Sequence, residues 1–143
     1  MFAIVNDRDE IVAEFDEYNN IRELNDNERI LETNISVPVG MLSKVVRVYN
    51  GKLVPKLVIE ILPNKRIIQA DGVDEIELTV ELLDRQPDEI VDSVILDIEG
   101  AKIPVEINND KGSVRFSTTN KGVFIIKADR EDVICLKRMF EAK

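Results

Sequence analysis

The chain has no histidine, no tryptophan and one cysteine among its 143 residues. The lack of histidine removes the side chain that most often serves as general base and as metal ligand. A single cysteine cannot form an internal disulfide, so the fold must hold together by packing alone. Cys135 lies in an apolar run, and we expect a small buried hydrophobic residue there rather than a nucleophile.

The sequence also disfavours a phosphate-binding loop, a membrane span, a signal peptide and binding to nucleic acid. The six glycines are isolated at predicted turns, so no glycine-rich phosphate loop is present. No apolar run approaches the ~20 residues that span a bilayer. The opening MFAIV is followed at once by the polar NDRDE, so we expect no signal peptide. A net charge of −9 disfavours nonspecific binding to nucleic acid or to anionic membranes, and we expect neither as a partner.

Two acidic loops could supply oxygen ligands to a cation. They lie at residues 7–10 and 108–110. Neither has the spaced oxygen ligands and the distal glutamate of a calcium loop, so we expect solvated turns. We therefore predict no metal, no cofactor and no catalytic residues, which means a protein that is not an enzyme.

Strict alternation of apolar and polar residues dominates the region from 73 to 128. The first run holds Ile76, Leu78 and Val80, and further runs follow at 94–98, 103–107, 114–116 and 124–128. A period of two places each apolar set on one face of a strand, and turn residues separate the runs. The pattern predicts an all-β fold, an antiparallel β-sandwich. We expect these residues to be among its most buried: Ile76, Leu78, Val80, Leu96, Val105, Phe116, Phe124 and Ile126.

The N-terminal third indicates a second, smaller β-rich part. Residues 1–15 predict a hairpin, and residues 44–54 predict another because Asn50-Gly51 separates two apolar runs. Residues 16–32 fit either one short helix or an irregular connection. A short strand is predicted at 33–39. This part has too little apolar sequence to make a core of its own, so we expect it to gain stability by packing elsewhere.

The segments on either side of the alternating region complete the sandwich. Residues 57–62 predict its first strand or the strand that joins the two parts, and 66–69 should continue it after a bend at Pro63. For 130–143 both strand and helix fit the spacing. We favour a final strand that forms a hairpin with 123–128 across 129–132. The predicted domains are a small docking module at 1–56, rich in β-hairpins, and a sandwich at 57–143.

Part of the chain resembles a known family. The residues are the Asp71-Gly72 lead-in, the alternating strand 75–82, the strand 112–119 and the closing strand 122–128. Over 58–140 they resemble bacterial immunoglobulin-like domains of the invasin/intimin type, which also occur in bacteriophage tail, baseplate and capsid-surface proteins. The resemblance implies an Ig-like sandwich with a structural or adhesive role. Unlike antibody domains, the chain lacks the Cys…Trp…Cys set.

Charge is distributed unevenly along the first half of the chain. Residues 1–40 hold ten acidic side chains and three arginines, a net −7, whereas 41–66 hold six basic side chains and one glutamate, a net +5. Such blocks can simply solvate two exposed faces. The alternative is a complementary pair, in which the acidic part of one copy meets the basic hairpin of a neighbour. The candidate interaction residues are Lys44, Arg47, Tyr49, Lys52 and Lys56.

These observations predict a non-enzymatic structural protein of a bacteriophage particle, in the tail, baseplate, neck or capsid surface. It would be made in the host cytoplasm and located in the virion. The expected partners are other virion subunits or further copies of the chain as a homo-oligomer. The alternative is a stand-alone module that binds carbohydrate or protein at a bacterial surface. That alternative predicts a cluster of exposed aromatic side chains, with Tyr18 and Tyr49 the best candidates.

Overall fold

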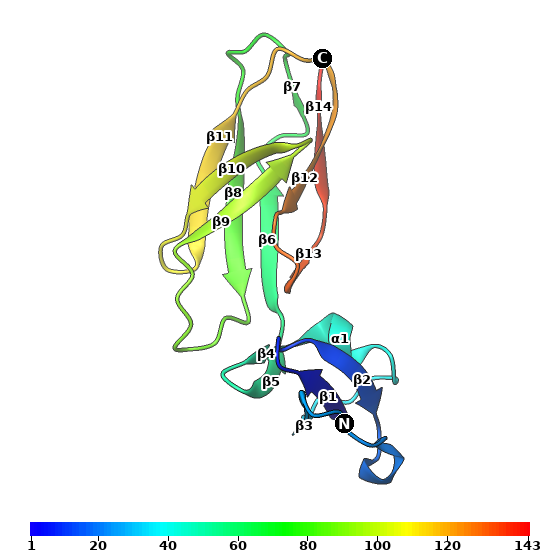
Figure 1. Cartoon of the computed structure of the whole chain (residues 1–143). Coiled ribbons are helices and arrows are strands. Elements are labelled where there is room, and N and C mark those ends of the chain that lie inside the picture. Colours follow the sequence, from blue (N-terminus) through cyan, green and yellow to red (C-terminus); the bar gives the residue numbers. More distant parts are fainter. The chain divides into compact units, whose positions relative to one another are not determined.

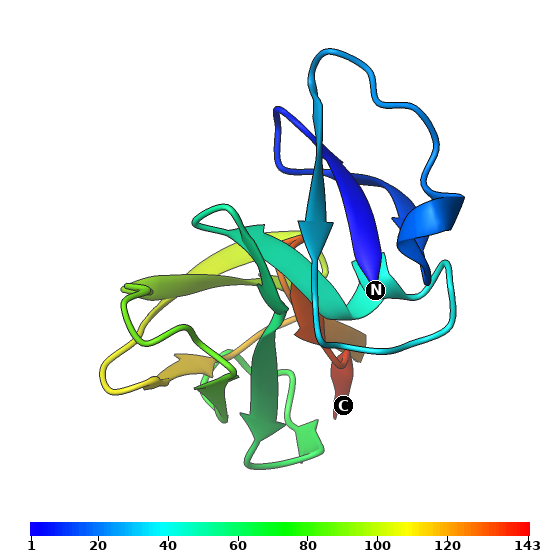
Figure 2. The same ribbon diagram turned by 90° about the horizontal axis from the view of Figure 1, so that it is seen from below.

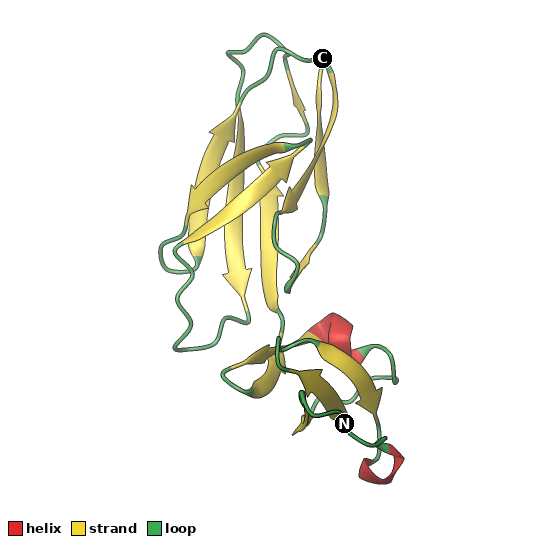
Figure 3. Ribbon diagram, viewed as in Figure 1, coloured by secondary structure: helices red, strands yellow, loops and turns green.

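The structure is a computed structural model that describes residues 1–143. Apart from two short helical turns, η1 (Tyr18–Asn20) and α1 (Leu42–Val45), its regular elements are all strands (Figures 1 and 3). The predicted all-β class is confirmed. The chain divides into two compact units, Met1–Lys56 and Leu57–Lys143, which we call the small unit and the sandwich. No helix has both the length and the apolar character needed to cross a bilayer.

Two sheets lie face to face in the sandwich (Figure 1). One has four strands in the order β11-β8-β6-β13, with bounds β6 Leu57–Pro63, β8 Ile76–Leu83, β11 Lys111–Phe116 and β13 Val133–Cys135. The other has five strands in the order β10-β9-β12-β14-β7, with bounds β7 Ile67–Ile68, β9 Ser93–Ile98, β10 Ala101–Glu106, β12 Gly122–Ala128 and β14 Arg138–Ala142. The strand predicted at 57–62 is therefore the first strand of the sandwich.

The alternating residues form the core between the sheets. Along β8 every inward position is buried, and six of the eight residues expected at the centre are at most 1% exposed: Ile76, Leu78, Val80, Leu96, Val105 and Ile126. The prediction is wrong for Phe116 and Phe124, which are only half-buried. Phe116 ends the edge strand β11, so it is covered on fewer sides than a residue of a central strand. Both rings pack on the buried Phe140, at centroid distances of 5.9 and 5.1 Å.

Two segments cross from one sheet to the other along the same side of the sandwich. The first passes from β6 to β7, and the second from β13 to β14. They run parallel, since β13 pairs with β6 and β14 pairs with β7. We call this side the crossed edge. The strand favoured for the C-terminus is confirmed, but its direct hairpin with β12 is wrong, because β13 joins the opposite sheet before β14 returns to β12.

The strand order is that of an immunoglobulin-like sandwich. If β6 and β7 are the two halves of strand A, then β8, β11, β9, β10, β12 and β14 take the places of B, E, C, C′, F and G. One sheet then contains A, B and E, and the other contains C′, C, F and G, as in Ig folds. The segment 66–69, predicted to extend β6, is instead the strand that changes sheet. The chain turns sharply after Pro63, so β7 cannot continue the β6 ladder.

On the side opposite the crossed edge, the chain passes between the sheets from β10 to β11. Asn109 and Asp110 both have positive φ, at 52° and 63°, in the tight turn that Asn108 and Lys111 close. Gly112 was predicted to stand where this turn meets the strand 112–119, and its glycine was attributed to the turn. It lies within β11, where a Cβ atom would come 2.0 Å from the carbonyl oxygen of Glu106. Glycine is therefore required here by the close approach of two backbones rather than by φ.

The small unit contains a three-stranded sheet and a separate hairpin. The sheet has the order β2-β1-β3, with β1 Phe2–Asn6, β2 Ile11–Phe15 and β3 Glu28–Glu32 (Figure 2). The hairpin pairs β4 (Val46–Tyr49) with β5 (Lys52–Pro55) around Asn50-Gly51, where both residues have positive φ. Both predicted hairpins are confirmed, although Lys44 belongs to α1 rather than to a strand.

Two segments of the small unit differ from expectation. Of the two alternatives for 16–32, the irregular connection holds for 16–27, which contain only the single turn η1. Neither alternative anticipated the strand at 28–32, which pairs with β1. The strand predicted at 33–39 is wrong, because pairing with β1 ends where the Thr33 amide donates to the Met1 carbonyl. With no partner strand left, residues 34–39 run without a ladder.

The small unit also has a core of its own, contrary to expectation. Its centre contains Ala3, Val5, Leu42 and Val46, each at most 1% exposed. Glu14 of β2 fixes α1 over the sheet, since its carboxylate accepts hydrogen bonds from the backbone amides of Gly40, Leu42 and Ser43 at 3.0, 2.7 and 3.2 Å. A carboxylate at the start of a helix satisfies amides that otherwise have no partner.

Candidate functional site

The five predicted interaction residues do not form one exposed cationic face. Lys44 and Lys52 are exposed and Lys56 is half-buried, but Arg47 is only 8% exposed. The guanidinium of Arg47 lies over the ring of Tyr49, 5.4 Å from its centroid, and its Nε donates to the Pro55 carbonyl at 3.5 Å. Through these two contacts Arg47 links β4 to β5 and stabilises the hairpin.

The structure also divides the basic block of residues 41–66. Lys44, Arg47, Lys52 and Lys56 belong to the small unit, whereas Lys65 and Arg66 belong to the sandwich. The block is continuous in sequence only. The predicted division into 1–56 and 57–143 already separates these residues, but the charge count over 41–66 ignored it.

Exposed aromatic side chains are scarce. Tyr18 is 63% exposed and packs edge-to-face on Phe2, with ring centroids 5.6 Å apart. Tyr49 is half-buried beneath Arg47, and the phenylalanines are half-buried or buried. The chain does not form the cluster of exposed rings on which sugars stack, so no structural observation favours the carbohydrate-binding alternative.

The two acidic loops use their oxygens within the chain. In the first, Asn6 Oδ1 accepts from the amides of Arg8 and Glu10, and Asp9 pairs with Arg29. In the second, Asp110 pairs with Arg85 at 2.6 Å. Nowhere in residues 1–143 are three His, Cys, Asp or Glu side chains grouped so that they could hold a metal ion.

Cys135 lies in β13 at the crossed edge. It is half-buried, and its thiol packs against the sandwich core, with Sγ 3.7 Å from the Leu136 carbonyl oxygen. It is thus less enclosed than predicted, because β13 is an edge strand of its sheet.

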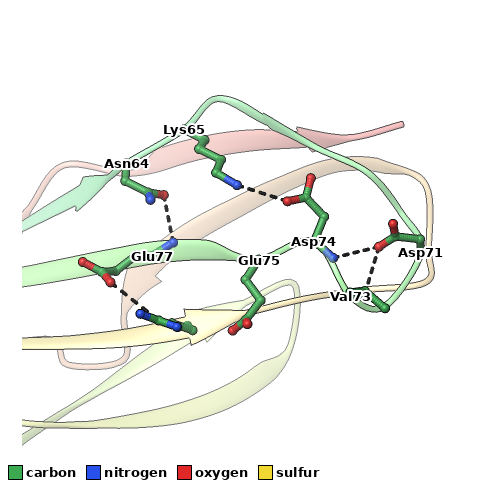
Figure 4. A pocket seen from close by; sticks show the side chains of 8 residues that line it. Asn64, Lys65, Asp71, Val73, Asp74, Glu75 and Glu77 are labelled. Atoms are coloured by element: carbon green, nitrogen blue, oxygen red, sulfur yellow. Dashed lines mark hydrogen bonds and ion pairs between the residues drawn. The ribbon is translucent and has the colours of Figure 1, made fainter.

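One groove lies at the end of the sandwich where the loop 69–75 turns (Figure 4). Asp71 accepts from the amides of Asp74 and Val73, and these hydrogen bonds lower the pKa of its carboxyl. Asp74 accepts from the Gln69 amide and pairs with Lys65 at 3.0 Å, which lowers its pKa also. The two carboxylates therefore stabilise the loop through hydrogen bonds and an ion pair within the chain.

A second groove has mixed charge. It is lined by Asp97, Glu99, Gly100, Ile125, Lys127 and Lys137. Asp97 accepts from Lys102 Nζ at 2.7 Å and from the Gly100 amide, and both hydrogen bonds lower its pKa. Its two carboxylates and two ammonium groups balance, so this groove has no net charge that would favour a ligand of one sign.

A third groove, of about 400 Å³, follows the crossed edge and is the one cationic site among them. Its lining is Leu62, Pro63, Lys65, Arg66, Lys137, Arg138 and Met139, which we call the basic groove. The crossing brings two Lys-Arg pairs together: Lys65-Arg66 follows β6, and Lys137-Arg138 stands where β14 begins. Sequence reasoning missed this site because the two pairs are 72 positions apart, as 137 minus 65 shows. The repeated dipeptide was the only available signal.

The complementary acidic surface lies in residues 16–27 of the small unit, which we call the acidic loop. All of its residues except Ile21 are exposed. It carries Asp16, Glu17, Glu23 and Asp26 against Arg22 alone, a net −3 (four minus one). Even that arginine is engaged, since it forms a bidentate pair with Glu28 at 2.9 and 2.7 Å.

Comparison with known proteins adds no name to this description. No family model matches the chain, and no curated protein matches its sequence. The class of the protein is therefore defined by its structure: an Ig-like β-sandwich joined to a small β-rich unit.

Proposed function

We propose that the chain is a non-enzymatic structural protein of a bacteriophage particle, a component of the tail, baseplate, neck or capsid surface. The small unit docks the chain to the particle, and the sandwich packs against neighbouring subunits. The resemblance of residues 58–140 to bacterial Ig-like domains of the invasin/intimin type supports this role, since such domains occur in phage surface proteins.

The observation that carries the proposal is a row of apolar side chains on the outer face of the five-stranded sheet. Val123, Ile125 and Met139 are 58, 41 and 64% exposed, and Ile125 is the register partner of Met139. Ile67, on the neighbouring edge strand β7, is 48% exposed. Glu141 lies between Val123 and Ile67 in register, so the apolar group itself is Val123, Ile125 and Met139, with Ile67 beyond it. Exposed apolar side chains grouped on one face of a sheet support a site of protein–protein contact. The partner we propose is another subunit of the same particle.

The test is whether the chain is part of a particle. Lysate from cells that produce the phage is fractionated on a density gradient, and the chain is detected with an antibody. The proposal predicts that the chain bands with the particles and stays there after a second gradient. A matched chain with Val123→Lys and Ile125→Lys should fold but be depleted from that band, whereas Lys121→Glu should band as wild type. A chain that remains entirely at the top of the gradient would show the proposal to be wrong.

A further inference from the structure

We propose that the basic groove of one copy binds the acidic loop of a second copy, so that chains associate head to tail. The inference rests on the proposed function, because it names one contact through which the chain would assemble. It also replaces the β4–β5 hairpin, whose Arg47 is buried, as the cationic half of the pair.

The groove has four cations and no carboxylate in its lining. Lys65 already forms an ion pair with Asp74. Arg138 is held in place because its Nε donates to the Ile61 carbonyl at 3.2 Å. Arg66 and Lys137 are exposed and form no ion pair within the chain, although Lys137 also lines the mixed-charge groove with Asp97 and Glu99. Two cations thus remain available at the surface, in a protein whose net charge is −9.

Three of the residues that line the groove are apolar, and this property selects among acidic partners. Leu62 and Met139 are 41 and 64% exposed beside the cations. A simple anion would leave these side chains uncovered. A protein segment that carries both carboxylates and apolar side chains would cover them, which stabilises the contact through burial.

The acidic loop has this composition. It combines four carboxylates with the exposed Tyr18 and Leu24, at 63 and 37%. Its second half is also held in shape before any contact forms, because the Arg22–Glu28 pair and the hydrogen bond from the Asn25 amide to Glu28 close residues 22–28. A loop that is already ordered loses less conformational entropy on binding.

The groove belongs to the sandwich and the loop to the small unit, so the contact joins unlike surfaces of two copies. In the head-to-tail arrangement each copy uses its groove on one neighbour and its loop on another, which makes the contact heterologous. Such contacts form rings when the rotation closes and filaments when it does not. Both arrangements are of the kind from which tubular and ring-shaped particle components are built.

Sedimentation velocity of charge-reversed variants tests the inference. Arg66→Glu with Lys137→Glu reverses the groove, and Glu17→Lys with Glu23→Lys reverses the loop; all four side chains are exposed, and far-UV circular dichroism verifies folding. Each double variant should associate at least about tenfold more weakly than wild type. A chain with all four substitutions should recover association, because the charges are complementary again. Lys111→Glu with Lys121→Glu, which has the same net charge as the groove variant, is the control.

The outcomes separate this inference from the proposed function. A monomeric wild-type chain, or equal loss in groove variant and control, would refute the groove–loop contact while leaving particle membership intact. If groove reversal depletes the chain from particles without any self-association, the occupant is a different subunit, and the second copy is wrong. Salt-sensitive association through the groove by a chain absent from particles would uphold the inference and refute the proposed function.

Discussion

Replacement of Gly112 by alanine should weaken the sandwich more than its position beside a surface turn suggests. The new Cβ would lie 2.0 Å from the Glu106 carbonyl oxygen and 2.9 Å from Val105 Cγ1. Contacts under 3.0 Å essentially do not occur, so β11 must move by at least about 1 Å away from the end of β10. The obstacle is backbone rather than a flexible side chain, so the strain cannot be relieved by a rotamer change.

Overpacking of this kind costs about 1–3 kcal/mol, and we expect the upper end, about 3 kcal/mol. For a domain of this size each kcal/mol lowers Tm by about 4–8 °C, which gives a fall of about 12–24 °C. The chain offers a probe for each unit. Both tyrosines lie in the small unit and the only cysteine lies in the sandwich. Thiol labelling of Cys135 during heating therefore reports the sandwich, and tyrosine fluorescence reports the small unit.

The control is Ser113→Ala, at the adjacent exposed position of β11. It should leave the Cys135 labelling transition within about 1–2 °C of wild type, since exposed substitutions away from special features cost at most about 0.5 kcal/mol. If Gly112→Ala and Ser113→Ala unfold at the same temperature, the close approach of β10 and β11 does not exist, and the account of how the chain passes between the sheets is wrong.

Three further predictions concern the small unit and the question of metals. Glu14→Ala should destabilise the small unit by about 2 kcal/mol, because three amides lose a charged acceptor, whereas Glu32→Ala should have little effect on its tyrosine-monitored unfolding. The Arg22 hydrogen bonds lower the pKa of Glu28 from 4.5 to about 2. Its stabilising contribution is therefore complete above pH 4.5 and is lost as the pH falls through about 2, so Glu28→Gln should flatten the acid unfolding curve in that range. EDTA should leave the unfolding transitions of the sandwich and of the small unit unchanged. A shift that Ca²⁺ restores would contradict the interpretation of the loops at 7–10 and 108–110 as solvated turns.

The sandwich could be predicted because its strands carry their pattern locally. Period-two alternation at Ile76, Leu78 and Val80 specifies the buried face of one strand with no knowledge of its neighbours. The Asn50-Gly51 hairpin was equally local, since both residues favour positive φ. Such features lie within windows of a few residues, where sequence reasoning is strongest.

The features that sequence reasoning missed depend on long-range pairing. The parallel contact between β6 and β13 joins Leu57 to Val133, and nothing local in either segment specifies it. The basic groove is a consequence of that pairing, so it was missed for the same reason. The glycine at 112 was attributed to a turn because a glycine needed for close approach and a glycine needed for a turn look the same in a sequence.

The burial of Arg47 was missed for a different reason. In sequence it is one of several cations in a basic block, and charged residues are mostly exposed. On β4 its guanidinium lies over the Tyr49 ring and its Nε donates to the Pro55 carbonyl, so the charge is engaged within the hairpin. The proposed cationic surface is therefore the basic groove of the sandwich rather than the hairpin of the small unit. The idea that it pairs with an acidic surface of another copy is unchanged.

The central claim is that copies of this chain meet through opposite charges on the groove and the loop. Its most direct test is sedimentation of an equimolar mixture of the two double variants, groove-reversed (Arg66→Glu, Lys137→Glu) and loop-reversed (Glu17→Lys, Glu23→Lys). Each variant alone presents like charges to its own copies, whereas the mixture pairs every groove with a loop of opposite charge. The account predicts that each variant alone sediments as a monomer and that the mixture associates as wild type does. Two monomers that ignore each other in the mixture, under conditions where wild type associates, would contradict it.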